Sequence, residues 1–287
     1  MIAEDVSKQI IRSAETYIDV AGNKCSVISL RALSAIARGR KISIRDLELS
    51  ALKNGIIPWR YLRNLGTIGV GGQIKLLESS VAVVGAGGLG GTIIELLARQ
   101  GIGHIIIIDD DRFVEQNLNR QLLSVEKNLG KNKAEVAARR VRRINSGVAL
   151  TVYVERLNEE NAIRLLKEAR VVADALDSLP ARFIVEKACR SLGIPLVHGT
   201  IGGFCGQLTT IFPEDAGLCC IYGSADSLPE QGIEAQIGNP STTPAVVAAL
   251  QVQEIVKIIT GIGKPIRNSI LVLDMMEGTA ERIDVRR

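Results

Sequence analysis

A glycine-rich segment at residues 85–90, GAGGLG, carries the first residues whose type and spacing could do chemistry. It follows the apolar run VAVVG and opens a segment typical of a helix. Such a segment lets backbone N–H groups at a helix N-terminus approach a phosphate. The glycines that permit this turn are Gly85, Gly87, Gly88 and Gly90. Asp109 ends the next apolar run, where a carboxylate can bind both hydroxyls of a ribose. These residues predict an adenine-nucleotide site and leave ATP and NAD open, beside the alternative of a tight turn without a ligand.

Three charged residues distinguish an ATP site from an NAD site. Arg120, Lys133 and Asp177 lie in segments that follow apolar runs, and in a parallel sheet such segments meet at the ligand-binding edge. Two cations can neutralise charge on an α-phosphate and on pyrophosphate, and a carboxylate can hold Mg²⁺. Hydride transfer to NAD has no such need. The set predicts nucleotidyl transfer from ATP with Mg²⁺, and Asp174 stays open between a metal ligand and a helix N-cap.

The elements that position these residues alternate along the chain from Glu78 onward. Fully apolar runs, typical of strands buried on both faces, alternate with segments of helical spacing. The predicted strands lie at 81–85, 104–110, 149–155, 170–176, 194–199 and 205–212, and a helix is predicted at 244–260. Residues 269–276 and 279–287 are expected to form a hairpin. The prediction is an α/β protein with a Rossmann-like, doubly wound, mostly parallel sheet and antiparallel C-terminal strands.

We predict that residues 1–58 form a small helical N-terminal extension and that residues 59–287 form the catalytic domain. Ile10 and Ile36 belong to two apolar runs near helical spacing, and Ser43 with Asp46 resembles a capping box at the start of a third helix. The extension is too short for a strong core of its own. We therefore expect it to pack on the rest of the chain or on a partner.

Composition excludes several classes of protein. The chain has 287 residues, 46% hydrophobic and 23% charged, which excludes disorder. A net charge of +4 and 3% aromatic residues argue against nucleic-acid binding. The longest uncharged stretch, 191–213, contains five glycines and two prolines and is a poor membrane helix. The acidic N-terminus has no apolar signal region, so we expect a cytoplasmic protein without a disulfide framework.

Four motifs in order identify a resemblance. VAVVGAGGLGG, DDDRFVEQNLNRQ at 109–121, LGKNKAE at 129–135 and DALDS at 174–178 resemble the ThiF/MoeB/HesA family of ubiquitin-activating-type adenylating enzymes, from about Trp59 to the C-terminus. The resemblance implies an adenylyltransferase that activates the C-terminal Gly-Gly carboxylate of a ubiquitin-like sulfur carrier, for molybdopterin or thiamine-like cofactor synthesis. The products would be an acyl-adenylate and pyrophosphate. A carboxylate is already ionised at pH 7, so the enzyme needs no nucleophile of its own.

The resemblance also implies residue roles. Asp109 would bind the ribose, and Asn117 would lie near the phosphates. Arg120 and Lys133 would contact the triphosphate and the transition state, and Asp177 would bind Mg²⁺. The segment WRYLRN at 59–64 resembles one whose arginine reaches the ATP of the other subunit, which makes Arg63 the candidate and predicts a homodimer.

The chain departs from the family in its cysteines. Many members bind zinc with two CxxC pairs, whereas here Cys219 and Cys220 are adjacent, Gly217 stands where a first cysteine would fall, and no second pair follows. We expect no zinc and interpret both cysteines as buried thiols. The loop from about 223 to 243 has no cysteine, and Cys205 falls at a strand entry. A separate sulfurtransferase is therefore expected.

The N-terminal extension leaves alternatives open. It could extend the dimer, grip a protein substrate, or indicate a relative of peptide-adenylating enzymes, which also carry an added N-terminal region. A non-catalytic subunit would be expected to lose the Arg120, Lys133 and Asp177 set. An NAD-dependent oxidoreductase would not need that set. His104, His198 and the basic run RRVRR at 139–143 are interpreted as structural or solvated residues.

Overall fold

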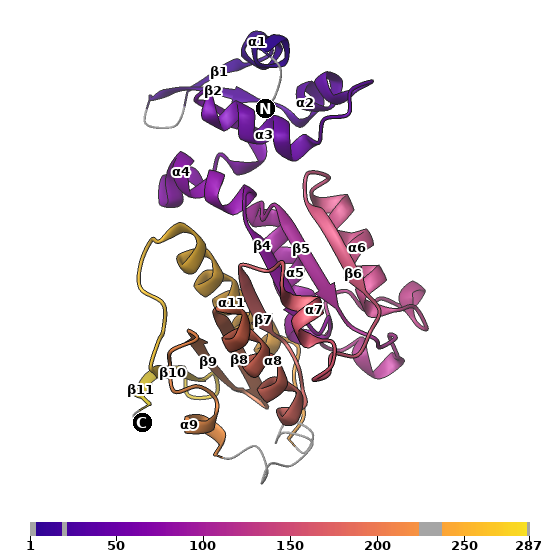
Figure 1. Cartoon of the computed structure of the whole chain (residues 1–287), viewed down its shortest axis with the longest axis vertical. Helices are drawn as coiled ribbons and strands as arrows, with labels where there is room; N and C mark the ends of the chain where they lie inside the picture. The colour runs from indigo at the N-terminus through magenta and orange to yellow at the C-terminus, as the bar shows by residue number, and fades with distance from the viewer. Residues whose placement is uncertain (1–3, 19–21, 224–236, 286–287) are drawn as a thin grey trace.

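The computed structural model describes residues 4–18, 22–223 and 237–285. Its main element is an eight-stranded sheet with the strand order β11-β10-β9-β8-β7-β4-β5-β6 (Figure 1). The strands are β4 Ser80–Val84, β5 His104–Ile108, β6 Ala149–Tyr153, β7 Val171–Asp174, β8 Leu196–Gly202, β9 Cys205–Ile211, β10 Ser269–Asp274 and β11 Thr279–Asp284. Strands β4 to β8 pair in parallel, and β9 to β11 continue the sheet in antiparallel pairs.

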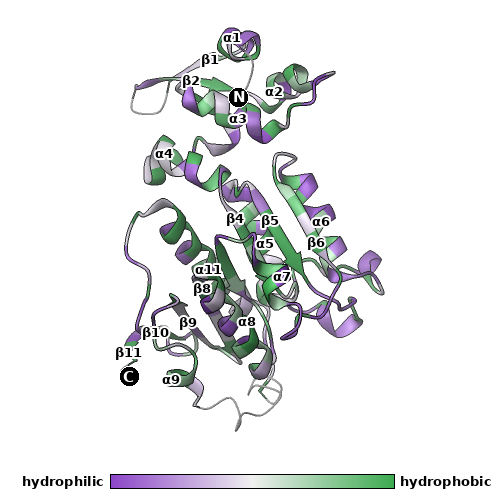
Figure 2. Cartoon of the chain, in the orientation of Figure 1, coloured by the Kyte–Doolittle hydropathy of each residue, from purple (hydrophilic) through white to green (hydrophobic). Residues whose placement is uncertain are grey.

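The central strand β4 shows why the parallel half forms. Val81 and Val83 lie in one hydrophobic core, and Ala82 and Val84 lie in the core on the opposite face. Both sets are almost completely buried, so the strand needs apolar residues at every position. Figure 2 shows the same apolar character along β4 and β5. The prediction of a doubly wound, mostly parallel sheet is confirmed.

Helices cover both faces of the sheet. One core packs against α4 Leu65–Leu77, α5 Gly88–Gln100, α6 Lys133–Ile144 and α11 Thr242–Thr260, and the other against α7 Ala162–Leu166 and α8 Leu179–Leu192. Helix α11 has the length and apolar composition of a membrane span. Its buried residues Val247, Ala248 and Ile255 pack in the core of the sheet, as expected of an internal helix.

The C-terminal hairpin is also confirmed. Strands β10 and β11 pair antiparallel from Ser269–Asp284 to Asp274–Thr279, and β10 joins the sheet through β9. Strand β11 is the outer strand, and all six of its residues are exposed.

The N-terminal extension contains a sheet that the sequence analysis did not predict. Its three helices are α1 Glu4–Arg12, α2 Leu30–Ala37 and α3 Ile44–Lys53. Strands β1 Glu15–Ile18 and β2 Lys24–Ile28 lie between α1 and α2, and β3 Ile56–Pro58 follows α3; they form a sheet in the order β1-β2-β3. The apolar pair at 27–28 therefore ends a strand, and the helix begins after it at Leu30. The predicted cap of α3 is present, because the Ser43 hydroxyl accepts the Asp46 N–H at 3.1 Å.

A buried polar cluster joins this extension to the main sheet. The Tyr61 hydroxyl donates to Glu48 of α3 at 3.1 Å and accepts from the Asn145 amide, at the end of α6, at 2.9 Å. Arg60 pairs with Glu48 at 3.3 Å. Glu48 and Tyr61 are fully buried. The extension, at the upper end of the molecule in Figure 1, is thus fixed to the elements below it.

Candidate active site

The glycine turn after β4 brings a helix N-terminus to the sheet edge. Gly85 has φ +92°, and a Cβ there would lie 2.6 Å from the carbonyl oxygen of Ala175. A Cβ on Gly90 would lie 1.8 Å from the carbonyl oxygen of Gly85. Only glycine allows this approach of α5 to the turn. The first N–H groups of α5 consequently open toward a cavity, as anion binding at a helix N-terminus requires.

The cavity has a volume of about 300 Å³ and lies at the carboxyl ends of β4, β5 and β7. This is where the strand order reverses, since β5 and β6 lie on one side of β4 and β7 and β8 on the other. Open α/β sheets bind ligands at this point. Most of the residues predicted from the sequence line it: Gly85, Gly87, Gly88, Asp109, Arg120, Lys133 and Asp177.

Asp109 connects the end of β5 to the glycine turn. Its Oδ2 accepts the N–H of Ala86 at 2.7 Å, and its Oδ1 accepts the N–H of Asp111 at 2.8 Å. Burial raises the pKa of Asp109, while the Ala86 N–H and Lys133 oppose the rise. Each carboxylate oxygen keeps a lone pair that a ribose hydroxyl can use.

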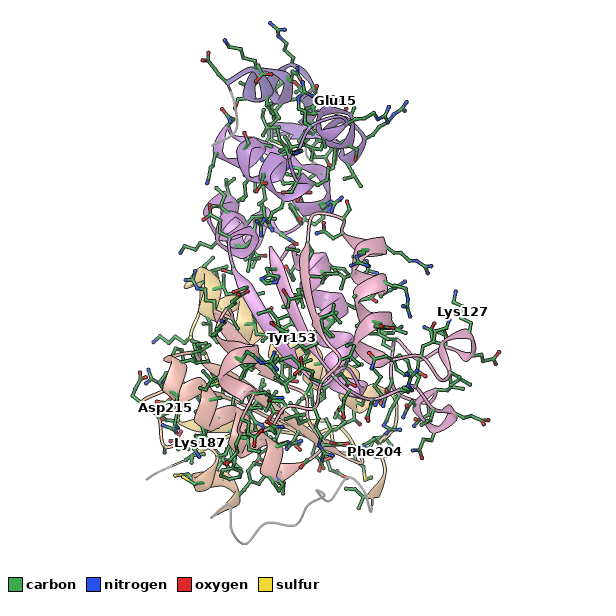
Figure 3. All side chains as sticks on the ribbon, turned by 45° about the vertical axis from the view of Figure 1, so that its right-hand side comes forward. Glu15, Lys127, Tyr153, Lys187, Phe204 and Asp215 are labelled. Carbon is green, nitrogen blue, oxygen red and sulfur yellow. The ribbon has the colours of Figure 1, made fainter. Side chains whose placement is uncertain are left out.

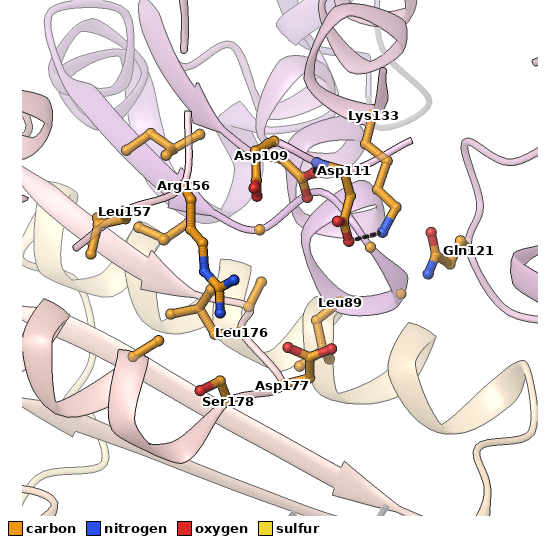
Figure 4. A pocket seen from close by; sticks show the side chains of 18 of the residues that line it. Leu89, Asp109, Asp111, Gln121, Lys133, Arg156, Leu157, Leu176, Asp177 and Ser178 are labelled. Atoms are coloured by element: carbon orange, nitrogen blue, oxygen red, sulfur yellow. Dashed lines mark hydrogen bonds and ion pairs between the residues drawn. The ribbon is translucent and has the colours of Figure 1, made fainter. Parts of the chain in front are cut away.

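Lys133 begins α6, and Asp111 holds its ammonium group. The Lys133 Nζ lies 2.8 Å from Asp111 Oδ2, and the Lys133 N–H donates to the carbonyl oxygen of Asp111 at 2.9 Å. Figure 4 shows this ion pair at the edge of the cavity. The Lys133 side chain is 9% exposed, whereas that of Asp111 is 69% exposed. Asp111 can therefore turn to solvent and release the ammonium group to a phosphate. The sequence analysis did not single out Asp111, although it lies in the acidic run that ends β5.

Arg120 and Asp177 reach the cavity from two different loops. The Arg120 guanidinium donates to the carbonyl oxygen of Gln116 at 3.0 Å and to Asn119 Oδ1 at 2.9 Å. Asp177 is exposed, and its carboxylate has neither a hydrogen bond nor an ion pair with any residue that the structure describes. Figure 3 shows Lys127 projecting from the outer side of the loop that carries Arg120. The cavity thus combines the cations Arg120 and Lys133, a carboxylate that pairs with none of the described residues, and a helix N-terminus.

Three predicted residues lie elsewhere. Asn117 is buried, and its Oδ1 accepts the N–H of Val114 at 3.0 Å, so it shapes the Arg120 loop and does not line the cavity. Gly90 acts through the close approach described above. Arg63 is exposed outside the cavity and bonds to no described residue of its own chain.

The structure adds residues that the sequence analysis missed. Arg156 points into the cavity from the loop after β6 (Figure 4). Arg182, in the first turns of α8, also lines it. Gln121 and Asn239 also belong to the polar lining, together with Asp110, Glu155 and Ser178. Arg182 could have been predicted from the sequence, because it lies five residues after Asp177 at the start of a predicted helix. Arg156 gave none, because it stands alone after a strand.

Asp174 is neither a metal ligand nor a helix cap. It is fully buried at the end of β7, where Oδ2 lies 2.6 Å from His198 Nδ1 and 3.8 Å from Arg182 Nε. His198 is thus a buried hydrogen-bond partner of Asp174, in line with its interpretation as a structural residue. His104 bonds to the Thr151 hydroxyl at 2.9 Å.

The prediction of buried thiols at Cys219 and Cys220 is wrong. Both are exposed, because α9 Cys219–Tyr222 is a four-residue surface helix. Cys205 is exposed at the start of β9, the strand entry that the sequence predicts. Within the described ranges, no group of three His, Cys, Asp or Glu side chains could hold a metal ion. The predicted cysteine-free loop falls largely at 224–236, outside the described residues.

Fold and cavity together define a Rossmann-type α/β protein with a nucleotide-sized, phosphate-compatible site. The ThiF family profile matches residues 61–287, and the chain belongs to this family.

Named relatives agree with that membership. The chain is 36% identical over 232 residues to the SAMP-activating enzyme E1 of Haloferax volcanii, covering 79% of this chain and 85% of that one. It is 36% identical over 242 residues to the sulfur carrier protein adenylyltransferase of Thermus thermophilus, covering 79% and 87%. The crystal structure of E. coli MccB with ATP superposes with a TM-score of 0.69 at 25% identity, covering 89% and 82%. The predictions of an adenylyltransferase and of ATP as its nucleotide are confirmed.

Proposed function

We propose that this adenylyltransferase activates the C-terminal carboxylate of a ubiquitin-like sulfur-carrier protein with Mg-ATP, giving a carrier acyl-adenylate and pyrophosphate. The names of the relatives from Haloferax volcanii and Thermus thermophilus support the class of substrate. The observation that carries the proposal is the cavity itself, in which Arg120, Lys133 and Asp177 surround the N-terminus of α5.

Each group has a task in this reaction. The carrier carboxylate attacks the α-phosphorus, the bond between the α-phosphorus and its bridging oxygen breaks, and pyrophosphate leaves. The N–H groups of α5 and the side chains of Arg120 and Lys133 stabilise the charge that develops on the phosphates. Asp109 holds the ribose, so that carboxylate and α-phosphate meet in line.

Asp177 fits a magnesium ligand. Mg²⁺ in nucleotide sites is held by one or two carboxylates together with substrate phosphates and water. Asp177 offers a carboxylate that no described residue engages, beside the helix N-terminus where the phosphates would lie. A bound Mg²⁺ would neutralise charge on the pyrophosphate leaving group.

Partners follow from the same reasoning. The sequence carries no cysteine between Gly223 and Thr243 and no paired CxxC motifs, so the proposed enzyme uses no zinc and stops at the acyl-adenylate. A separate sulfurtransferase would then supply the sulfur. A homodimer is part of the proposal, because Arg63 lies outside its own cavity and is free to serve a neighbour's.

The first test is ligand-dependent stabilisation. Mg-ATP at about 100 times its Kd stabilises the folded state by about 2.7 kcal/mol, which raises the unfolding midpoint. We expect this shift with Mg-ATP and none with NAD, and a weaker shift in Arg120→Ala and Asp177→Ala. Arg139→Ala is the control, because Arg139 pairs only with Glu135, at 3.9 Å on the exposed face of α6. A shift with NAD alone would refute ATP-dependent adenylation.

Adenylation of a peptide is the second candidate. Residues 61–287 are 227 of 287, or 79% of the chain, whereas the match to MccB solved with MccA-N7isoASN covers 89% at 26% identity. That match must include part of the N-terminal extension. Exchange of labelled pyrophosphate into ATP distinguishes the two candidates. Exchange with Gly-Gly-ending carriers supports the first, and exchange only with short peptides supports the second.

A further inference from the structure

A buried ion network lies directly behind the turn that carries Asp177. At its centre, Asp174 is fully buried, and its carboxylate lies 2.6 Å from His198 and 3.8 Å from Arg182. Burial alone would raise the pKa of Asp174, but the charge of Arg182 and the hydrogen bond from His198 keep it lowered. Asp174 is therefore an ionised group with a cation on one side and an imidazole on the other.

This network holds the backbone of the turn on both sides of Leu176. Asp174 Oδ1 accepts the N–H of Leu176 at 3.0 Å. Arg182 donates from Nε at 3.2 Å and from Nη2 at 2.5 Å to the carbonyl oxygen of Leu176. Asp177 is the next residue after Leu176, and its carboxylate bonds to none of the residues that the structure describes. Its direction is consequently set by the two peptide groups of Leu176 and not by a contact of its carboxylate.

His198 extends the network to α9. Because Asp174 is ionised, His198 Nδ1 carries the proton and donates to it, and Nε2 accepts from the Tyr222 hydroxyl at 2.9 Å. This assignment follows from the partners on each ring nitrogen. The His198 and Tyr222 rings meet edge to face at 5.7 Å. Tyr222 is the last residue of α9, so one chain of hydrogen bonds runs from the Asp177 turn to that helix.

Burying an ion network of this kind in a core costs desolvation free energy. Apolar side chains of similar volume are often as stabilising as a buried ion pair, since both charges lose their hydration. Here Arg182 donates twice to the carbonyl oxygen of Leu176, and Asp174 accepts the Leu176 N–H besides its bond from His198, in the turn that carries Asp177. The arrangement favours a role in placing that carboxylate over a role in stability alone.

We propose that Arg182 and Asp174 are positioning residues that direct Asp177 toward the nucleotide phosphates, and that His198 and Tyr222 couple this placement to α9. The inference rests on the proposed function, because it takes Asp177 as the magnesium ligand. It assigns Arg182 to the backbone of Leu176 and not to the nucleotide, although Arg182 also borders the cavity.

Calorimetric titration of the full chain with ATP, in EDTA and in saturating Mg²⁺, tests the assignment. The readout is the ratio of the two affinities, which is the gain due to Mg²⁺. In Arg182→Gln we expect this gain to fall about tenfold, while the affinity without metal changes less than twofold. Arg182→Lys, which keeps the charge and one donor, should recover part of the gain. A direct contact of Arg182 with ATP would instead lower both affinities equally and overturn the proposal.

Arg190→Gln is the matched control. Arg190 lies on the same helix and also donates to backbone carbonyl oxygens, those of Pro213 and Asp215, each at 2.6 Å. It should leave the gain unchanged, and an equal loss in both variants would reduce Arg182 to a structural residue.

Tyr222→Phe removes one hydroxyl and retains the ring, so it stays informative if Arg182→Gln does not fold. It should lower the gain about threefold, and an unchanged gain would refute the coupling to α9. If the wild-type chain binds ATP without any gain from Mg²⁺, the proposed role of Asp177 fails first, and the positioning role fails with it.

Discussion

At the scale of single residues, Gly90 is a position in the nucleotide turn where backbone leaves no room for a side chain. A Cβ at Gly90 would meet the Gly85 carbonyl at 1.8 Å, whereas a Cβ at Gly66 in α4 would meet nothing within 4 Å. Gly90→Ala should lower the free energy of unfolding by about 1–3 kcal/mol through overpacking and abolish ATP binding. Gly66→Ala should be neutral or stabilising by up to about 1 kcal/mol, because alanine favours a helix. Urea unfolding with nucleotide titration measures both, and equal stability of the two variants would contradict this account of the turn.

His198 is the residue whose titration should appear in the stability of the fold. Burial lowers the pKa of His198 below its usual value near 6.5, against the opposing effect of Asp174. The charged or titratable groups around it are Asp174, Arg182, Glu186 and Tyr222. Below about pH 6.5 the unfolded chain binds a proton that the folded chain does not bind, so stability falls as pH falls, until the folded imidazole also protonates.

Urea unfolding at pH 7.5, 6.5 and 5.5 measures this loss, which is at most about 1.4 kcal/mol per pH unit for one group. His198→Gln should show a shallower decline. His104 is the other histidine, and it is present in both proteins. Parallel declines would mean that His198 takes up its proton equally in the folded and unfolded chains, against the burial that lowers its pKa.

At the scale of elements, the polar cluster between α3 and α6 leads us to predict that Tyr61 stabilises the fold. Burial raises the pKa of Tyr61 and of Glu48, so the phenol stays protonated and donates to Glu48. Tyr61→Phe would remove the hydroxyl that donates to Glu48 and accepts from Asn145, leaving the buried Glu48 with only its ion pair to Arg60 among the described residues, at a cost of about 1–3 kcal/mol. Tyr17→Phe is the control, since Tyr17 lies on strand β1 with its ring against Trp59 and its hydroxyl bonds to no residue that the structure describes. Calorimetry should show a lower midpoint for Tyr61→Phe alone.

The elements also show what a single sequence can and cannot predict. Strands β4 and β5 were predictable because burial on both faces demands an unbroken apolar run. Strands β1 and β3 were not, because β1 is largely exposed and β3 has three residues, so neither leaves a pattern. Helix α4 was hidden by its glycines, one of which, Gly69, interrupts it at φ +66°. In the cavity, the motif residues were found, whereas Arg156 and Arg182 depend on which loops the fold brings together.

At the scale of the whole molecule, the proposed homodimer predicts complementation between two inactive variants. Arg63→Ala removes a side chain outside its own cavity, and Arg120→Ala one inside it. A mixed dimer keeps one cavity in which both arginines are wild type, so mixing should restore about a quarter to a half of the activity. Pyrophosphate exchange measures it, with mass spectrometry to verify mixed dimers. Verified mixed dimers without activity would refute a role of Arg63 in the neighbouring subunit.

The buried cluster of Glu48, Tyr61 and Asn145 has a consequence for exchanging parts between relatives. Glu48 comes from the extension, Tyr61 from the junction and Asn145 from the end of α6. Along the chain, Glu48 lies 13 residues from Tyr61, and Asn145 lies 84 residues from it. A recombined gene that joins this extension to another family member would inherit Glu48 without Arg60 and Tyr61, the two residues that pair with it, and would bury an acid that has lost both. The extension therefore cannot be exchanged alone, and successful chimaeras must transfer Arg60 and Tyr61 along with it and keep the Asn145 amide that bonds to Tyr61.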